Sequence, residues 1–240
     1  MSLDETENSL ASQMPKIDRF EEGTKVGFAA LLSLLPYVGG SLATTLTGSL
    51  AIADRYSQEK WLYMLAQRVD GLAKGDGPTV ETLVNDAPFV AAVVKALRIS
   101  RETSNEEKQS LLANAACNSG SWAPNEEAVA TFFMRLLERY EPEHVLVLRA
   151  CDDPDSFLRD HSENVGNGQL HWIFTNIVYA GIVEWEPLTS VVLRDLHQDK
   201  LINDAVGLGY DLKDAKHRLS TPMGHEFLRF CTAPDLTAKG

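Results

Sequence analysis

The feature that most constrains this chain is a run of 28 residues, Val26 to Ala53, without a charged side chain. About 20 apolar residues cross the hydrocarbon core of a bilayer, so the run is long enough for a membrane span. However, Pro36, four glycines and six serines or threonines divide it into two shorter and less apolar pieces. The sequence therefore predicts a helical hairpin and not one continuous helix.

Small residues recur along the second piece of this run. Pro36 and Gly39 favour a reversal, and Gly40, Thr44 and Gly48 follow at four-residue spacing. Such spacing lets two helix backbones approach closely, in lipid or in a soluble core. We expect a hairpin buried in the protein core. A hairpin that inserts into a membrane under some conditions is the alternative, and a constitutive span is the third reading.

Helical spacing and helix-capping residues dominate the rest of the first two thirds of the chain. Ser104 and Glu107 form the pattern of a capping box, and Pro142 suits the first turn of another helix. No stretch shows sustained alternation of period two. Residues 1–15 hold few apolar groups, which predicts disorder. The predicted helices cover about 20–35, 41–73, a short stretch from 79, a longer one from 88, 104–117, 125–140 and 142–150.

The pattern changes in the last third of the chain. The acidic segment 152–155 and the polar run 161–169 are typical of a linker, so we place a domain boundary between residues 164 and 165. Beyond it we expect an apolar stretch over 170–183, a helix over 188–202, a glycine-bearing ribbon and a closing helix. The predicted fold class is mainly α, with a multi-helix bundle over 16–164 and a winged-helix-like unit over 165–240.

The net charge disfavours nucleic acid as the main partner. The formal charge is −12, and phosphate binding depends on clustered lysine and arginine. A recognition helix and wing would nevertheless offer a modest basic patch, interspersed with aspartates that repel phosphate. We therefore favour protein contact or self-association, with a DNA-binding regulator as the alternative. The residues of this possible partner or DNA contact are Arg194, Lys200, Lys213, Lys216 and Arg218.

The cysteines and the first residues bear on cellular location. Cys117, Cys151 and Cys231 are odd in number and far apart, which is typical of reduced thiols. Residues 1–14 lack the basic and apolar regions of a secretory signal. We expect a cytoplasmic protein, peripheral to the inner membrane if the hairpin inserts.

Motifs for catalysis and for cofactors are missing from the sequence. It has no phosphate-binding GxxxxGK[ST] pattern, and the pair Gly207 and Gly209 lacks the third glycine of a dinucleotide site. Its six histidines form no zinc motif, and no serine stands in a GxSxG elbow. We expect no enzyme, no metal, no cofactor and no small-molecule substrate.

Two segments carry a resemblance to a known family. Residues 34–42, LLPYVGGSL, and residues 219–227, LSTPMGHEF, resemble the bacterial Abi-alpha family, which is associated with abortive phage infection. Residues 106–108 and 143–148, each opening an apolar helix, are similar to the same family. The resemblance implies an accessory role in defence against phage and supplies no catalytic residues. We therefore expect a non-enzymatic interaction or effector protein, which acts through the hairpin if it is toxic.

Overall fold

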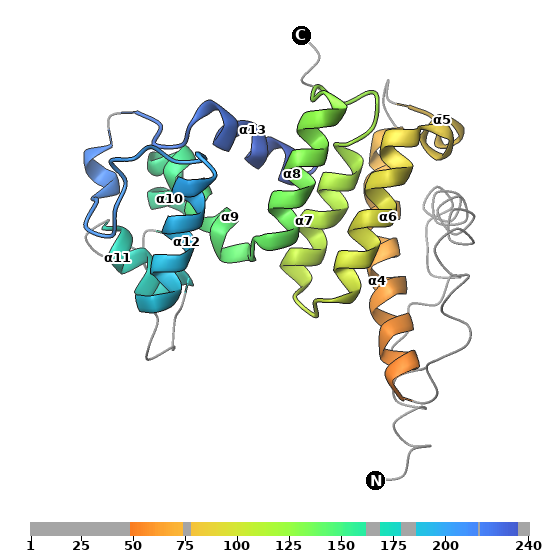
Figure 1. Ribbon diagram of the computed structural model, residues 1–240, viewed down its shortest axis with the longest axis horizontal. Helices are drawn as coiled ribbons and strands as arrows, with labels where there is room; N and C mark the ends of the chain where they lie inside the picture. The colour runs from red at the N-terminus through yellow and green to blue at the C-terminus, as the bar shows by residue number, and fades with distance from the viewer. Residues whose placement is uncertain (1–48, 74–77, 162–168, 179–185, 216, 235–240) are drawn as a thin grey trace. The chain divides into compact units, whose positions relative to one another are not determined.

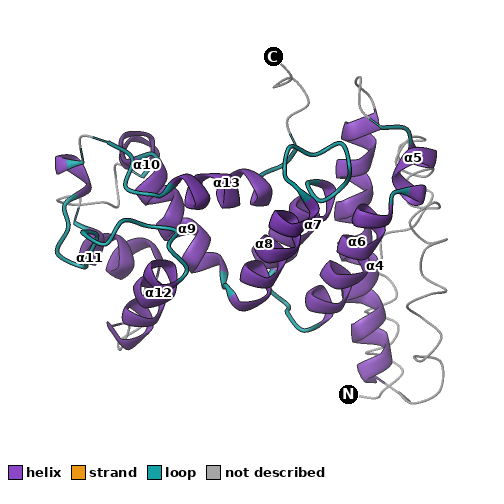
Figure 2. Cartoon of the chain, turned by 45° about the horizontal axis from the view of Figure 1, so that its top comes forward, coloured by secondary structure: helices purple, strands orange, loops and turns teal. Residues whose placement is uncertain are grey.

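The computed structural model describes residues 49–73, 78–161, 169–178, 186–215 and 217–234, and Figure 1 draws the rest as a grey trace. The predicted mainly α-helical fold is confirmed for this part of the chain, in which Figure 2 shows helices and loops but no strand. A π-helix, η2 (Phe174–Val178), and a 3-10 helix, η3 (Leu212–Asp214), accompany ten α-helices within the described ranges. The α-helices are α4 (Ser49–Ala73), α5 (Val80–Asn85), α6 (Ala87–Arg101), α7 (Glu106–Cys117), α8 (Glu127–Arg139), α9 (Pro142–Asp152), α10 (Pro154–Asp160), α11 (Leu170–Ile173), α12 (Glu186–Gln198) and α13 (Pro222–Cys231).

The chain divides into two compact units. Unit 1 comprises residues 1–138 and 230–240, and unit 2 comprises residues 139–229. The predicted boundary between residues 164 and 165 falls outside the described residues and stays a prediction. The apolar hairpin over 26–53 also lies outside them, apart from the first turn of α4. No helix in the described ranges has both the length and the apolar composition that crossing a bilayer requires.

Unit 1 is built on α4, α6 and α7, which lie side by side (Figure 1). Their facing surfaces bury large apolar side chains, including Trp61 of α4, Phe89 of α6 and Leu112 of α7. The indole of Trp61 donates to the carbonyl oxygen of Gln109 at 3.1 Å. Because the indole N–H has this partner, the largest buried side chain of the unit leaves no donor unsatisfied.

A half-buried cation joins α4 to α7. The Arg68 guanidinium donates to the amide oxygen of Asn114, to the Ser110 hydroxyl at 2.7 Å and to the Met64 carbonyl at 2.8 Å. Burial lowers the pKa of Arg68, although a guanidinium stays charged throughout the ordinary pH range. Asn114 in turn donates to the carbonyl oxygen of Cys231, so the end of α13 is tied into unit 1.

Local capping sets where several helices begin. Thr79 caps α5 and Asp86 caps α6, as expected for oxygen-bearing side chains before an apolar helical run. The predicted cap at Ser104 is wrong, because Asn105 caps α7 with its amide oxygen 3.1 Å from the amide nitrogen of Lys108. Asparagine caps as well as serine does, so sequence alone does not choose between the two neighbours.

The acidic segment 152–155 is not a solvated linker. Asp152 ends α9, Asp153 caps α10 with its carboxylate on the amide of Ser156 at 2.9 Å, and Pro154 opens α10. Two helices of unit 2 therefore meet directly at this acidic segment, where the Asp153 carboxylate bonds to the backbone and the Asp152 carboxylate to side chains.

Helix α12 ends earlier than predicted. It stops at Gln198, four residues before Ile202, and Lys200 has the left-handed φ of 57°. The amide of Leu201 bonds to the Leu196 carbonyl and the amide of Lys200 to the His197 carbonyl, which is the Schellman pattern of a helix end. Because a lysine stands at the position that usually holds glycine, this helix end has no signal in the sequence.

Residues 219–225 include the start of α13, and they contact Cys151 and Leu201. The amides of Leu219 and Ser220 both donate to the carbonyl oxygen of Cys151, at 2.8 and 3.1 Å. The Thr221 hydroxyl accepts from the amide of Gly224, which satisfies a donor in the first turn. Gly224 packs so closely on the carbonyl oxygen of Leu201 that a Cβ atom there would overlap it. Glycine is therefore required at this contact.

Extended pairing in the described part of unit 2 is limited to two isolated antiparallel bridges. Gln169 pairs with Asp211, and Ile202 pairs with Ser220. Backbone hydrogen bonds from Asn203 to Leu219 and from Thr221 to Leu201 flank the second bridge. The residues after α12 thus return to lie beside the residues before α13.

Candidate functional surfaces

The basic residues that the sequence singled out lie in unit 2, and most are already paired. Arg194 bonds to the Asp195 carboxylate at 2.9 Å, Lys200 to Asp204 at 3.3 Å and Arg218 to Asp152 at 3.2 Å. Lys213 is an exposed residue of the 3-10 helix η3, and Lys216 falls outside the described residues. The exposed pairs of Arg194 and Lys200 are weak, but the carboxylate in all three pairs cancels charge that a phosphate would need.

Helix α12 presents apolar side chains to solvent. Leu188 is 43% exposed and Val191, one turn along, is 39% exposed, while Thr189, Val192 and Leu196 face the core. Trp172 of α11 is a further large exposed side chain of unit 2. Side chains three residues apart share one face of a helix, so Leu188 and Val191 form a small apolar surface. We call these two residues the α12 apolar face.

A carboxylate with three donors lies where α9 ends. Asp152 accepts from the Ser220 hydroxyl, from Arg218 and from Nδ1 of His225, which lies 3.0 Å from Oδ2. Sequence reasoning missed this cluster, because it treated Asp152 as part of a linker and His225 as one of six scattered histidines. Asp152 and His225 are 73 residues apart, so no local pattern could have joined them.

The contact between α9 and α12 contains a second buried polar group of residues. The Tyr140 hydroxyl donates to the Asp199 carboxylate at 2.6 Å, and Arg139 bonds to the same oxygen. The Tyr140 ring stacks on His144 with ring centres 4.6 Å apart. Burial raises the pKa of Tyr140, and its bond to Asp199 raises it further. The phenol therefore stays protonated and holds the two helices together.

His144 in this group is left with an unsatisfied donor. Its Nδ1 accepts from the amide of Glu141, so the proton is on Nε2. That nitrogen is buried without a hydrogen-bond partner, since the Asp195 carboxylate lies 3.7 Å away. Burial lowers the pKa of His144, and the nearby Asp195 charge opposes this effect only in part. The folded protein thus favours the neutral imidazole.

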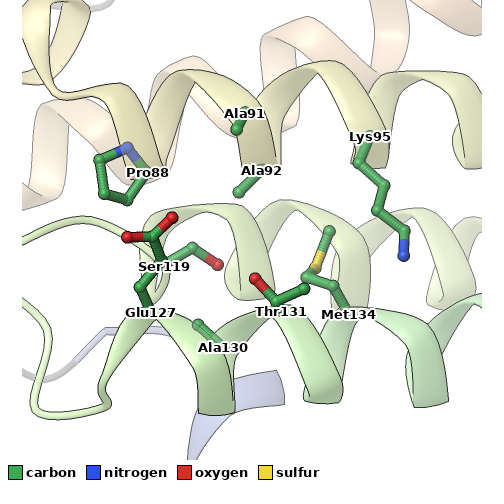
Figure 3. A pocket seen from close by; sticks show the side chains of 9 residues that line it. All are labelled: Pro88, Ala91, Ala92, Lys95, Ser119, Glu127, Ala130, Thr131 and Met134. Atoms are coloured by element: carbon green, nitrogen blue, oxygen red, sulfur yellow. The ribbon is translucent and has the colours of Figure 1, made fainter.

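A hollow in unit 1 lies between α6 and α8. Figure 3 shows Ala91 and Ala92 of α6 facing Ala130 and Met134 of α8, with Lys95 towards one end of the hollow and Glu127 towards the other. Its volume is about 170 Å³. Small-molecule sites usually enclose roughly 300–1,000 Å³, so this hollow suits one apolar side chain better than a substrate.

The cysteine thiols are poor candidates for nucleophiles. All three are buried and unbonded to one another. Burial raises the pKa of Cys117 to about 12, despite the positive charge of Arg68, and raises that of Cys151 to about 12. A thiol must ionise to attack or to bind a metal, so these cysteines stay inert near neutral pH.

Two further predictions concern metal and the hairpin. Among the described residues, no three histidine, cysteine or acidic side chains come close enough to hold a metal ion. The residues predicted to pack the hairpin or to enter a membrane, namely Pro36, Gly39, Gly40, Thr44 and Gly48, lie outside the described part of the chain.

Comparison with known proteins adds no relative. No protein-family model, no curated protein sequence and no solved structure matches the chain.

The buried neutral histidine predicts a pH dependence of stability. Unfolding restores the ordinary pKa of 6.5 to His144, so the unfolded chain binds more protons below that pH. The stability from this residue is complete above pH 6.5 and is lost as the pH falls through the lower folded pKa. Replacing His144 by Phe keeps the stacking on Tyr140 but removes the titration.

We expect the free energy of unfolding of the His144→Phe variant to depend less steeply on pH between pH 7.5 and 5. The difference in slope approaches about 1.4 kcal/mol per pH unit for one proton. Denaturant unfolding at a series of pH values measures both slopes. Parallel curves for the two proteins would show that His144 is not held neutral by the fold.

Proposed function

We propose that the chain is a non-enzymatic interaction or effector protein associated with phage defence, and that unit 2 docks a protein partner through the α12 apolar face. Support for the defence role comes from the resemblance of residues 34–42 and 219–227 to the Abi-alpha family. The proposal assigns no catalytic step to any residue.

The exposed apolar side chains of α12 carry the docking part of the proposal. The apolar side chains of Leu188 and Val191 are exposed to water, which is unfavourable. Binding of a partner would bury this apolar area and so would gain free energy. The one cation on the described surface of this helix, Arg194, already bonds to Asp195. A surface with apolar side chains and a compensated charge suits a protein better than a phosphate backbone.

We further propose that unit 2 is winged-helix-like, with α12 in the position of the recognition helix. The antiparallel bridge between Ile202 and Ser220 would begin the ribbon, and the residues between them would form the wing. Support for this comes from the order of α12, the bridge and α13 along the chain. Winged-helix units bind proteins as well as DNA, so the architecture leaves the partner open.

DNA binding is the alternative function. Its difficulty is the charge of unit 2, which has nine lysines and arginines against fifteen aspartates and glutamates. A DNA-binding surface would therefore have to draw on Lys213, Lys216 and Arg218 within an acidic surround. Binding to duplex DNA that weakens steeply with salt would favour this alternative over protein docking.

The proposed toxic step is insertion of the hairpin over 26–53 into the inner membrane. It rests on the uncharged run and on the spacing of Gly40, Thr44 and Gly48. Dye release from liposomes by the intact chain tests it, and the double variant Gly40→Leu with Gly48→Leu should lose that activity. Absence of release under every trigger would remove this step from the proposal.

Substitution of the α12 apolar face tests the docking proposal. We expect Leu188→Glu and Val191→Glu each to weaken partner binding roughly 30-fold, the effect of losing about 2 kcal/mol at a central interface residue. Bacteria that express the protein should then be protected from phage less well, measured as a higher efficiency of plating. Gln198→Glu adds the same charge at an exposed site of the same helix and should leave protection unchanged.

The control variant Gln198→Glu separates the loss of docking from a general effect of added negative charge. Equal loss in all three variants, or unchanged protection in Leu188→Glu and Val191→Glu, would contradict docking through this face. Circular dichroism on each purified variant establishes that the helices are retained.

A further inference from the structure

We infer that His225 is a nucleophilic imidazole that can accept a phosphoryl group on Nε2, with Asp152 holding Nδ1 and Arg218 bound to the same carboxylate. The inference is independent of docking through α12, because it rests on different residues and a different chemistry.

The hydrogen bond to Asp152 fixes which nitrogen of His225 reacts. A carboxylate only accepts, so Nδ1 must carry the proton that it shares with Oδ1 and Oδ2 at 3.1 and 3.0 Å. The lone pair is then on Nε2, which has no hydrogen-bond partner within the described residues. The carboxylate also fixes the orientation of the ring, as it does behind metal-binding histidines. The side chain is 31% exposed, so a small reagent can reach it.

Three other histidines, His144, His197 and His161, lack this combination. His144 is buried and uses Nδ1 as an acceptor. His197 donates from Nε2 to the Val206 carbonyl at 2.7 Å, so that nitrogen has no lone pair to offer. His161 donates from Nδ1 to the Phe157 carbonyl at 2.9 Å. It has the same tautomer as His225 with a neutral partner in place of a carboxylate, which makes it a matched internal control.

The surroundings of His225 suit an anionic group. It lies in the first turns of α13, a helix of ten residues whose amino-terminal end carries partial positive charge. Arg218 contacts Asp152 through Nε, which leaves four of its five N–H groups for other acceptors. The nearest acidic neighbour in sequence, Glu226, is paired with Arg229 at 3.1 Å. The carboxylate that orients the ring therefore also holds a guanidinium that has N–H groups left for an anion.

The transfer balances with a phosphoramidate as donor. The Nε2 lone pair forms the new N–P bond, and the P–N bond of the donor breaks with its electron pair leaving on nitrogen as ammonia. The imidazole becomes a cation, and its Nδ1 proton stays in the hydrogen bond to the Asp152 carboxylate. The negative charge of Asp152 thus stabilises the product as well as orienting the nucleophile.

Phosphorylation of the intact chain with phosphoramidate tests the inference. We expect His225 to be modified about tenfold faster than His161 and His217 in the same sample, the scale on which a carboxylate behind a functional imidazole acts. Phosphorus NMR and peptide mass spectrometry under alkaline conditions assign the sites. Asp152→Asn should slow His225 by a similar factor while His161 is unaffected, and Arg218→Gln should slow it less.

The comparison within wild type needs no variant and is decisive by itself. Modification of His225 at or below the rate of His161 would overturn the inference. So would an Asp152→Asn protein that keeps the wild-type rate at His225. If that variant fails to fold, the rate at His161 changes as well, and the wild-type comparison alone then decides.

Discussion

The fold of unit 2 depends on the end of α9, where one residue supplies a backbone acceptor and the next supplies a carboxylate. The Cys151 carbonyl accepts the amides of Leu219 and Ser220, and Asp152 accepts the Ser220 hydroxyl, Arg218 and His225. These groups are distant in sequence, so the contact closes a loop of about seventy residues at considerable entropic cost. Charge-assisted hydrogen bonds to a largely buried carboxylate are strong enough to offset part of that cost. The start of α13 and the position of Leu201 follow from this contact.

The residues of segment 219–227, one of the segments that carry the family resemblance, have identifiable roles at this contact. In residues 219–227, Ser220 and His225 bind Asp152, Thr221 caps α13, and Gly224 allows the close approach to Leu201. Each of these contacts stabilises the start of α13. The thiols are buried, and the hollow between α6 and α8 is smaller than most small-molecule sites. Among the described residues, the α12 apolar face and the partly exposed His225 side chain are accessible to solvent.

The sequence predicted those features that depend on near neighbours. The start of a helix near Thr79 and the proline start of α9 were foreseen, because the signals for a helix start lie within one helical turn. The cap at Asn105 was misplaced by one residue, since Ser104 satisfies the same rule. The end of α12 was missed because Lys200 takes a conformation that sequence rules reserve for glycine. The Asp152 cluster was invisible because its members come from segments that only tertiary folding brings together.

Hydrogen exchange on the intact chain with Asp152 replaced by Ala tests the central claim most directly. The account predicts that the amides of Leu219, Ser220 and Gly224 lose protection, while amides within α4, α6 and α7 of unit 1 exchange as in wild type. If protection over 219–225 is unchanged, the carboxylate does not hold this segment, and the account of unit 2 is wrong.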